Sequence, residues 1–581
     1  MEKKKSVLFN PKTFKGERFD KRTNEAFKDA IEFFEHKGIS EIRKDAEAKV
    51  WCHDWIEYQG EHGIFATMLT AEGYGDDPTA RFDLSRICTM SELLGFYSGG
   101  YQYPFQVSIL GVGPVWMGDN EAQKQDLARQ LKEGELFAFG MSEKTHGADL
   151  YSNECTIRPE GSGKYMANGN KYYIGNAHIS PKVATLGKNT ETGEWTFWVV
   201  DSNDRHYNYV KDIETKSSGL CQLGEYEMIE YPITDNEILK VGDEAFADGL
   251  STVNIGKFNC GWSEVGMVSH ALFEAVTHAD RRKIYGHTVT DNFPHIRSFL
   301  SESFCRANAM KLYTLRALDY FRVMSEDDRR YLLFNPIVKN KVCREGGEVM
   351  RLIMDVVCAK GYETDTYISD AMINADMYAR LEGTAHVNMG LILRFIKNYF
   401  FSNKEYPEIG IVTEAKDDKN VFAQTMGGLG KVEFSDFGKA YKDVEIPNAR
   451  IFFDQVLKFR NLMMKGAPDE KMSKNIDYML NIGEMFSIIV YAQLIMESAK
   501  LHEVEDELVD QIFALFIKDM SKYALAQINS QENTDVQKDC LWEIVKVAPT
   551  IDKKRDYKFF KEYVQVLDGE YMSKGTVVGI D

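Results

Sequence analysis

The chain has few cysteines for its length, and they form no pattern typical of a metal site or a disulfide framework. Nine cysteines occur in 581 residues, with no CxxC pair and no ligand-like spacing. Single scattered thiols are typical of a reducing compartment. We therefore expect free thiols, no structural metal and a cytoplasmic location. The scattered positions include Cys52, Cys155, Cys260, Cys358 and Cys540.

The chain also lacks an excess of positive charge. Lysine and arginine number 70 against 89 aspartates and glutamates, which gives a formal charge of −19. Such a protein repels nucleic acid and anionic membrane surfaces unless a local basic patch overrides the repulsion. We expect no nucleic-acid partner. Peripheral membrane contact is the weaker reading, because the C-terminal helical segments lack the basic face of an interfacial anchor.

Long hydrophobic segments are missing as well. The basic start MEKKKSVLF is not followed by the apolar stretch of a secretory signal. The most apolar run, from Met485 to Met496, has roughly a dozen residues, whereas a membrane-spanning helix needs about 20. The sequence therefore predicts no membrane span.

The common nucleotide-binding and hydrolase motifs are absent. No GxGxxG follows a predicted strand, and GGLGK lacks the other residues of a P-loop. HExxH and GxSxG do not occur either. These absences remove the Rossmann, P-loop, zinc-protease and α/β-hydrolase interpretations as first choices, so a dinucleotide would have to be bound in another way.

Four successive segments differ in their hydrophobic pattern and predict a mainly α fold with a small central β domain. Helical periodicity dominates the first, third and fourth segments, whereas aromatic and β-branched residues with short turns dominate the second. The predicted units are an N-terminal helical domain at 1–134, a middle β domain at 135–247, a helical bundle at 248–400 and a C-terminal helical extension at 401–581.

Local signals divide these segments further. In the first, the stretches GYGDD, SGGYQYP and GVGPVWMG predict joints between helices. In the second, Asn168-Gly169 predicts a turn between two strands, and EWTFWVVDS predicts another strand. In the third, a helix through Val349 and Val356 is expected to end at Gly361. In the fourth, apolar helical faces predict docking on the other units or on a second copy.

An acidic residue stands at an unusual joint in ARLEGTAHVN. Glu382 lies between a mixed polar segment and a strongly apolar helical one, beside a Gly-Thr pair that breaks regular structure. Acids are common at helix N-termini because the helix dipole favours negative charge there. An isolated Glu-Gly-Thr would therefore not by itself indicate catalysis.

Four stretches in a fixed order give this acid a context. They are FAFGMSEKTHGADL, GNKYYIGN, THADRRKIYGHTV and RLEGTAHVN. Together they resemble the acyl-CoA dehydrogenase superfamily over about residues 20 to 400. The resemblance implies a helical N-terminal domain, a β-barrel-like middle domain and a helical bundle, to which this chain adds a C-terminal helical region.

The resemblance also implies FAD bound without a Rossmann domain. Arg282 matches the arginine that in relatives reaches the FAD pyrophosphate of the neighbouring subunit. Tyr173 and Gly175 stand where relatives have the Trp and Thr beside the flavin, and Cys358-Ala359 replaces a Gly-Gly pair, so individual contacts differ from the family pattern. The implied cofactor-binding residues are Ser142, Gly147, Tyr173, Gly175, Arg282, Tyr285, Gly361 and Thr384.

The implied reaction is α,β-dehydrogenation of an acyl-CoA thioester to its trans-2-enoyl form, as in fatty-acid β-oxidation, with Glu382 as the base. Gly383 would let backbone approach the substrate, and Lys257 falls where relatives carry an Arg near it, or is a solvated lysine. Burial raises the pKa of a carboxyl and a helix start lowers it. We expect burial to prevail for Glu382 once substrate is bound.

Three interpretations of the function are open, and two of them differ in the electron acceptor. A dehydrogenase would pass electrons to an electron-transfer flavoprotein, whereas an acyl-CoA oxidase would pass them to oxygen. The THG sequence and the long C-terminal region lend weight to the oxidase. A flavin-free scaffold of the same fold is the third reading. The extension also resembles that of very-long-chain members, which are dimers, so we expect a homodimer; the acyl chain length is not fixed by the sequence.

Overall fold

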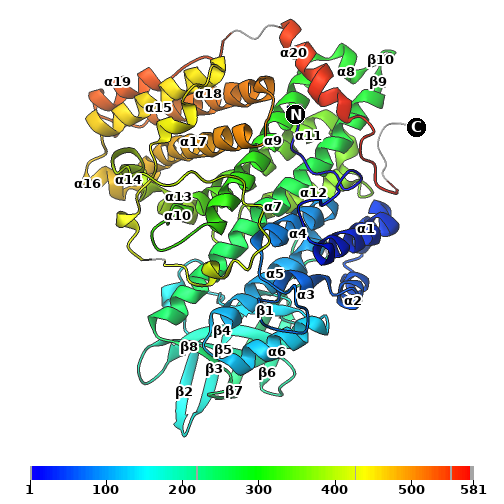
Figure 1. The fold of residues 1–581 in the computed structure, drawn as a ribbon, viewed down its shortest axis with the longest axis vertical. Coiled ribbons are helices and arrows are strands. Elements are labelled where there is room, and N and C mark those ends of the chain that lie inside the picture. Colours follow the sequence, from blue (N-terminus) through cyan, green and yellow to red (C-terminus); the bar gives the residue numbers. More distant parts are fainter. Residues whose placement is uncertain (1–2, 217–219, 426, 550–552, 576–581) are drawn as a thin grey trace.

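The computed structural model describes residues 3–216, 220–425, 427–549 and 553–575. Figure 1 shows a β-sheet at one end of the molecule and helices over the rest. The longest helix, α7 (Asp243–Arg281), contacts the sheet near its start and the small β9–β10 hairpin at its end. The mainly α fold with a central β domain, expected from the sequence, is confirmed.

The first six helices pack around α4 and α5, which both lie against α7. α5 continues through Gly111 and Gly113 and ends at Met117 with Gly118 as its C-cap, so the joint predicted at GVGPVWMG lies at the end of that stretch. An added Cβ at Gly111 would lie 2.6 Å from Phe137 Cβ, and one at Gly113 would lie 2.7 Å from Thr252 Oγ1. These glycines therefore permit close packing of a continuous helix. The six are α1 (Lys21–Glu47), α2 (His53–Glu61), α3 (Ile64–Leu69), α4 (Leu84–Tyr97), α5 (Gly99–Met117) and α6 (Glu121–Lys132).

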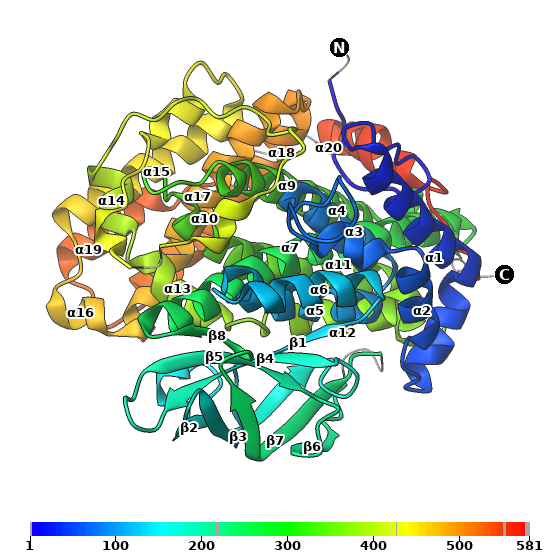
Figure 2. The ribbon, with the colours of Figure 1, turned by 60° about the horizontal axis from the view of Figure 1, so that its bottom comes forward.

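Eight strands form one sheet below these helices (Figure 2). The strand order is β6-β7-β3-β2-β4-β5-β8, and β1 pairs in parallel with β4. β2 also runs parallel to β4, whereas the other neighbours are antiparallel. The strands are β1 (Phe137–Gly140), β2 (Thr156–Gly161), β3 (Lys164–Gly175), β4 (Lys182–Asn189), β5 (Trp195–Asp201), β6 (Tyr207–Asp212), β7 (Leu223–Thr234) and β8 (Ile238–Val241).

The turn predicted at Asn168-Gly169 is absent, because both residues lie inside the continuous strand β3. The pairing of β3 with β7 shifts its register between Ala167 and Gly169, as at a β-bulge. An added Cβ at Gly169 would lie 2.9 Å from Cys155 Cα. The Asn-Gly pair therefore serves a bulge and a close strand approach rather than a hairpin turn.

The third group of helices surrounds α7 and includes one π-helical turn, which interrupts the helix between α10 and α11. π-Helical turns are rare in proteins, and many of those that occur lie at functional sites. The group consists of α7, β9 (Lys283–Ile284), β10 (His287–Thr288), α8 (Val289–Asn292), α9 (Pro294–Arg322), α10 (Tyr331–Ile337), the π-helical turn Val338–Val342, α11 (Cys343–Val357), α12 (Tyr367–Tyr378), α13 (Ala385–Leu393) and α14 (Ile396–Phe401).

The helix α11 ends at Val357, four residues before the predicted stop at Gly361. Cys358 ends the helix with φ 55° and ψ −134°, a conformation in which glycine is far more common. Gly361 instead lies buried in the short 3₁₀ turn Cys358–Tyr362, where an added Cβ would lie 2.6 Å from Met354 Sδ. Close packing against Met354 therefore explains why a glycine stands at position 361.

The C-terminal region is a helical layer docked on the bundle, with α17 against α9 and α13. The apolar run at 485–496 lies inside the 26-residue α17, so the expected segment was too short. Among the described helices, α17 is the one long and apolar enough to cross a membrane, but 89% of its apolar window is buried in the fold. The helices are α15 (Pro447–Lys465), α16 (Glu470–Lys474), α17 (Ile476–Leu501), α18 (Asp506–Ile528), α19 (Asp535–Ile544) and α20 (Lys553–Phe559).

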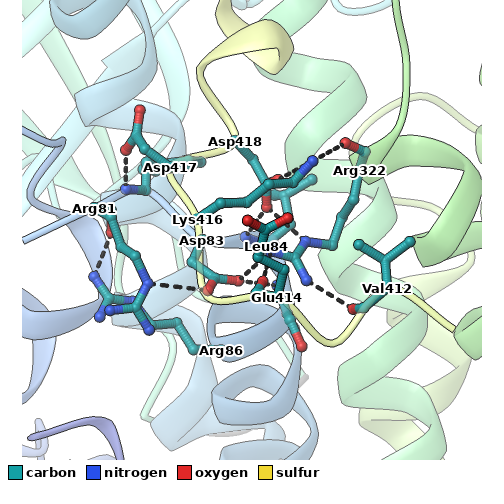
Figure 3. Close-up of polar contacts among 12 residues, drawn as sticks. Arg81, Asp83, Leu84, Arg86, Arg322, Val412, Glu414, Lys416, Asp417 and Asp418 are labelled. Atoms are coloured by element: carbon teal, nitrogen blue, oxygen red, sulfur yellow. Dashed lines mark hydrogen bonds and ion pairs between the residues drawn. The ribbon is translucent and has the colours of Figure 1, made fainter. Parts of the chain in front are cut away.

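A buried ion-pair network ties the segment that leads into this layer to the N-terminal helices (Figure 3). Arg322, at the end of α9, donates from Nε to Asp418 at 2.9 Å and lies 3.2 Å from Asp83, the N-cap of α4. Its two remaining nitrogens donate to the carbonyl oxygens of Val412 and Glu414. One guanidinium thus joins three parts of the chain.

Replacing Arg322 by methionine should therefore destabilise the protein, by about 3–5 kcal/mol, because the buried carboxylates of Asp83 and Asp418 each lose one of their two cation partners. Denaturant unfolding measures the loss. Lys474→Met is the control, since its ion pair with Glu470 is exposed and its removal should cost less than about 0.5 kcal/mol. Equal losses in the two variants would contradict a stabilising role for the network.

Candidate active site

Glu382 lies in the connection between α12 and α13, in a strained backbone conformation. Its φ is +51°, and that of Gly383 is +83°. Left-handed φ values are uncommon for residues other than glycine and concentrate at functional sites. Thr384 ends the strained turn as N-cap of α13, accepting a hydrogen bond from the Val387 N–H at 3.4 Å.

The carboxyl of Glu382 is half-buried, and its electrostatic surroundings are mixed. Burial raises its pKa from 4.5 to about 7, while the ammonium groups of Lys339 and Lys257 oppose the rise. Burial therefore outweighs the two positive charges. A carboxyl with a pKa near 7 is well suited to exchange a proton at neutral pH.

Lys257 projects from α7 into the same region and is buried, so the reading of a solvated lysine is wrong. Its ammonium lies 3.4 Å from Asn388 Oδ1. Burial lowers its pKa to about 8; Lys339 lowers it further, and Glu382 acts in the opposite direction. Lys257 therefore shares its buried surroundings with Glu382.

Two further residues of this region were not identified from the sequence. Lys339 is fully buried on the π-helical turn, and its position in the apolar stretch YLLFNPIVKNKV was the available signal. Tyr103, on α5, is buried, and burial raises its pKa, with the charges of Cys221 and Glu382 adding to the rise. It carried no signal beyond an aromatic residue in a helix.

The β-sheet contributes the residues of the first two motifs. The Ser142 hydroxyl donates to the Tyr172 carbonyl at 2.7 Å. The neighbouring Tyr173 has φ +63° and a side chain that is 59% exposed, although it belongs to a strand. Gly147 is exposed and has no atom within 4 Å of an added Cβ. An open polar surface therefore lies at this end of β3.

Gly175 is the point where this strand meets α5. An added Cβ at Gly175 would lie 2.5 Å from Val107 Cγ2 and 2.9 Å from Tyr103 Cε1. Tyr103 and Val107 also form a small apolar cluster with Leu381, the neighbour of Glu382. The structure therefore brings the end of β3 and the Glu382 segment together through α5.

Two other motif residues have a structural role. Lys171 is fully buried, and its ammonium lies 3.0 Å from Glu143 Oε1. Glu143 also accepts hydrogen bonds from the N–H groups of Glu154 and Cys155 at 2.7 and 2.9 Å. This pair joins the loop after β1 to β3.

The remaining predicted residues lie far from Glu382. Arg282 and Tyr285 belong to the β9–β10 hairpin after α7, and Tyr285 is 89% exposed. Gly361 lies beside Lys360 in the turn after α11. The charges of Lys360 and Arg282 both act on His278 near the end of α7, which places this turn close to the hairpin. Lys257, whose charge acts on Glu382, lies 24 residues before Arg281 on α7, a rise of about 36 Å, so one chain does not bring Arg282 and Tyr285 to Glu382.

Comparison with known proteins agrees with this architecture. Residues 246–397 match the family model for the acyl-CoA dehydrogenase C-terminal domain. The 3-(aryl)acrylate reductase of Clostridium sporogenes is 22% identical over 358 residues, which cover 61% of this chain and 91% of that protein. An acyl-CoA dehydrogenase complexed with FAD from Bacillus anthracis has a TM-score of 0.75 at 15% identity, covering 97% of each chain.

These matches are consistent with the acyl-CoA dehydrogenase superfamily. The CarC subunit of the caffeyl-CoA reductase-Etf complex of Acetobacterium woodii is 19% identical over 374 residues, which cover 62% of this chain and 95% of that protein. The reductases leave about two-fifths of the chain unmatched, whereas the B. anthracis structure extends over the C-terminal helices as well.

The raised pKa of Glu382 predicts a pH-dependent stability that needs no cofactor. Between about pH 4.5 and pH 7 the folded carboxyl holds a proton that the unfolded one has lost, so stability falls as the pH rises. A change from 4.5 to about 7 corresponds to roughly 3 kcal/mol. The unfolding free energy of the wild type relative to Glu382→Gln should fall by this amount between pH 4 and pH 8. A difference that stays constant with pH would show an ordinary exposed carboxyl.

Proposed function

We propose that the protein is an FAD-dependent oxidoreductase that interconverts an acyl-CoA thioester and its trans-2-enoyl form, as in fatty-acid β-oxidation. The observation that carries the proposal is a half-buried carboxyl, Glu382, with a pKa near 7, beside the open end of β3. Family relatives described with FAD support the cofactor.

The residues of the sheet end fit a flavin ring. The exposed ring of Tyr173 offers an apolar face, Gly147 leaves open space, and Ser142 retains acceptor lone pairs. Gly175 supplies no hydroxyl, and its Cβ space is taken by Val107 and Tyr103. The flavin would therefore be held here by the loop after β1 and by Tyr173, with Thr384 at the start of α13.

The chain's own residues would act on the proton and on the thioester oxygen. Glu382, as carboxylate, would take the proton from the carbon next to the thioester. The chemistry that FAD would supply when bound is acceptance of a hydride from the following carbon. Negative charge then develops on the thioester oxygen. The backbone N–H of Glu382 makes no hydrogen bond within the described part of the chain and can donate to that oxygen. Gly383 leaves room for this approach.

Reduction of a 2-enoyl group is the second candidate direction. It is favoured by the two relatives that are named as reductases, one of which is a subunit of a complex with Etf. The same name supports an electron-transfer flavoprotein as the electron partner. Rapid peroxide formation in air with an acyl-CoA would instead identify an oxidase, and colourless purified protein would identify the flavin-free scaffold.

Glu382→Gln should keep its flavin yet lose about 10²- to 10⁴-fold in the rate of flavin bleaching, because the amide cannot accept the α-proton. The measurement is anaerobic mixing with acyl-CoAs of graded length, followed at the flavin band.

Glu408→Gln is the matched control, since Glu408 is an exposed carboxylate in the loop after α14, and it should bleach at the wild-type rate. Normal bleaching by Glu382→Gln would refute the assignment of the base.

We further propose a homodimer in which each flavin is shared between two chains. Arg282 and Tyr285 lie at the far end of α7 from Glu382. The Arg282 guanidinium makes no hydrogen bond or ion pair with the described residues of its own chain. A second copy that places this hairpin beside the first copy's sheet would complete the site, with Gly361 beside the hairpin.

Complementation tests this arrangement. Arg282→Met and Glu382→Gln homodimers should each be inactive or flavin-poor. A co-expressed mixed dimer should regain up to about half of the wild-type activity per dimer, because one of its two sites combines an intact Arg282 with an intact Glu382. Mixed dimers no more active than the two parents would show that each site is built from one chain.

A further inference from the structure

Lys339 is a fully buried cation that closes the end of α12. It lies on the π-helical turn Val338–Val342, and its ammonium donates a hydrogen bond to the carbonyl of Tyr378, the last residue of α12. The last carbonyls of a helix lack partners within the helix, and a cation there also meets the negative end of the helix dipole. Lys339 therefore stabilises the point at which α12 stops.

Tyr378 is held from both ends. Its hydroxyl donates to Gln102 Oε1 and, at 3.3 Å, to the Gly99 carbonyl, both on α5. The strained residues Glu382 and Gly383 follow only four and five positions later. Left-handed residues persist where the surroundings fix them. The bond from Lys339 thus fixes one end of the short segment that carries the base.

Glu382 is surrounded by few groups that could set its charge. Tyr103 on α5, Lys257 and Cys260 on α7, and Lys339 on the π-helical turn interact with it electrostatically. Burial raises the pKa of Glu382, and of the two lysines that oppose the rise, Lys339 has the larger effect.

The other acidic neighbours of Lys339 are buried. Cys260 and Cys343 are buried thiols whose pKa values are raised by burial. Glu264 is fully buried on α7, and neither of its carboxyl oxygens has a hydrogen-bond partner among the described residues. Burial raises the pKa of Glu264 well above its usual range, and the charge of Lys339 opposes the rise. Of the acids near Lys339, Glu382 is the one that lies in the strained segment after α12.

We propose that Lys339 is a positioning residue for the base, holding the Glu382 segment through the end of α12 and supplying the positive charge that the Glu382 carboxylate faces. The inference rests on the proposed role of Glu382. Lys339 itself does not exchange the substrate proton in this arrangement.

The test follows the protonation of Glu382 directly. Infrared difference spectra of protein labelled with ¹³C-glutamate give the carboxyl titration, and Glu382→Gln identifies the band. Lys339→Met and Lys339→Gln should both raise the midpoint by about one pH unit or more. Lys339→Arg, which keeps the charge, should restore most of the wild-type midpoint. Glutamine at position 339 keeps a hydrogen-bond donor but carries no charge, whereas methionine has neither. A comparison of Lys339→Met with Lys339→Gln therefore separates the effect of the hydrogen bond from that of the charge.

Lys341→Met is the matched control. Lys341 lies on the same turn and is also buried, but its ammonium pairs with Glu345 at 2.6 Å and faces Asp519. It should leave the Glu382 midpoint unchanged. The proposal is overturned if the Glu382 midpoint moves no further in Lys339→Met and Lys339→Gln than it does in Lys341→Met.

Flavin bleaching supplies the second readout. At pH values below the wild-type midpoint, the bleaching rate of Lys339→Gln should fall about tenfold for each pH unit by which the Glu382 midpoint is raised. The rate should recover at higher pH. A loss that is equal at every pH would mean a purely structural role and contradict the proposal. If no acyl-CoA bleaches the wild type, the proposed function fails, while the infrared titration still decides the role of Lys339.

Discussion

Burial of a carboxyl costs free energy when it ionises, and this cost at Glu382 governs the rest of the site. The side chain is half-buried, and burial outweighs the attraction of two lysines, so the pKa settles near 7. Without Lys257 and Lys339 the carboxyl would stay protonated and could not accept a proton. With full exposure it would be too weak a base. The bundle therefore balances desolvation against charge at one position.

The same position explains why the surrounding helices are arranged as they are. α7 carries Lys257 in its first half and is followed by the β9–β10 hairpin; Lys257 and Arg281 are 24 residues apart on the helix, a rise of about 36 Å. A site that needs both ends requires two copies. The C-terminal layer is fixed to the N-terminal helices through Arg322 and Asp418, away from Glu382. It thus holds the bundle without contributing the base.

Much of the architecture follows from the sequence because helical and strand periodicity report local burial. The predictions of secondary structure are wrong where tertiary packing determines the local backbone conformation. Gly111 and Gly113 lie inside α5, which ends at Met117, and allow it to pack close to its neighbours, whereas Gly169 allows a bulge where the sequence predicted a turn. Four stretches in a fixed order, the last of them containing Glu-Gly-Thr, singled out Glu382 as the candidate base. Lys339 could not be assigned from sequence, because its role depends on a π-helical turn that aims it at the end of α12.

The central claim is that Glu382 meets the carbon next to a thioester in a site completed by a second chain. A crystal structure of the flavin-loaded protein with a non-reactive acyl-CoA analogue tests it most directly. The account predicts a dimer in which a Glu382 oxygen lies about 3–3.5 Å from that carbon, with the partner chain's β9–β10 hairpin at the flavin. A carboxylate turned to solvent, with the thioester bound elsewhere, would contradict it.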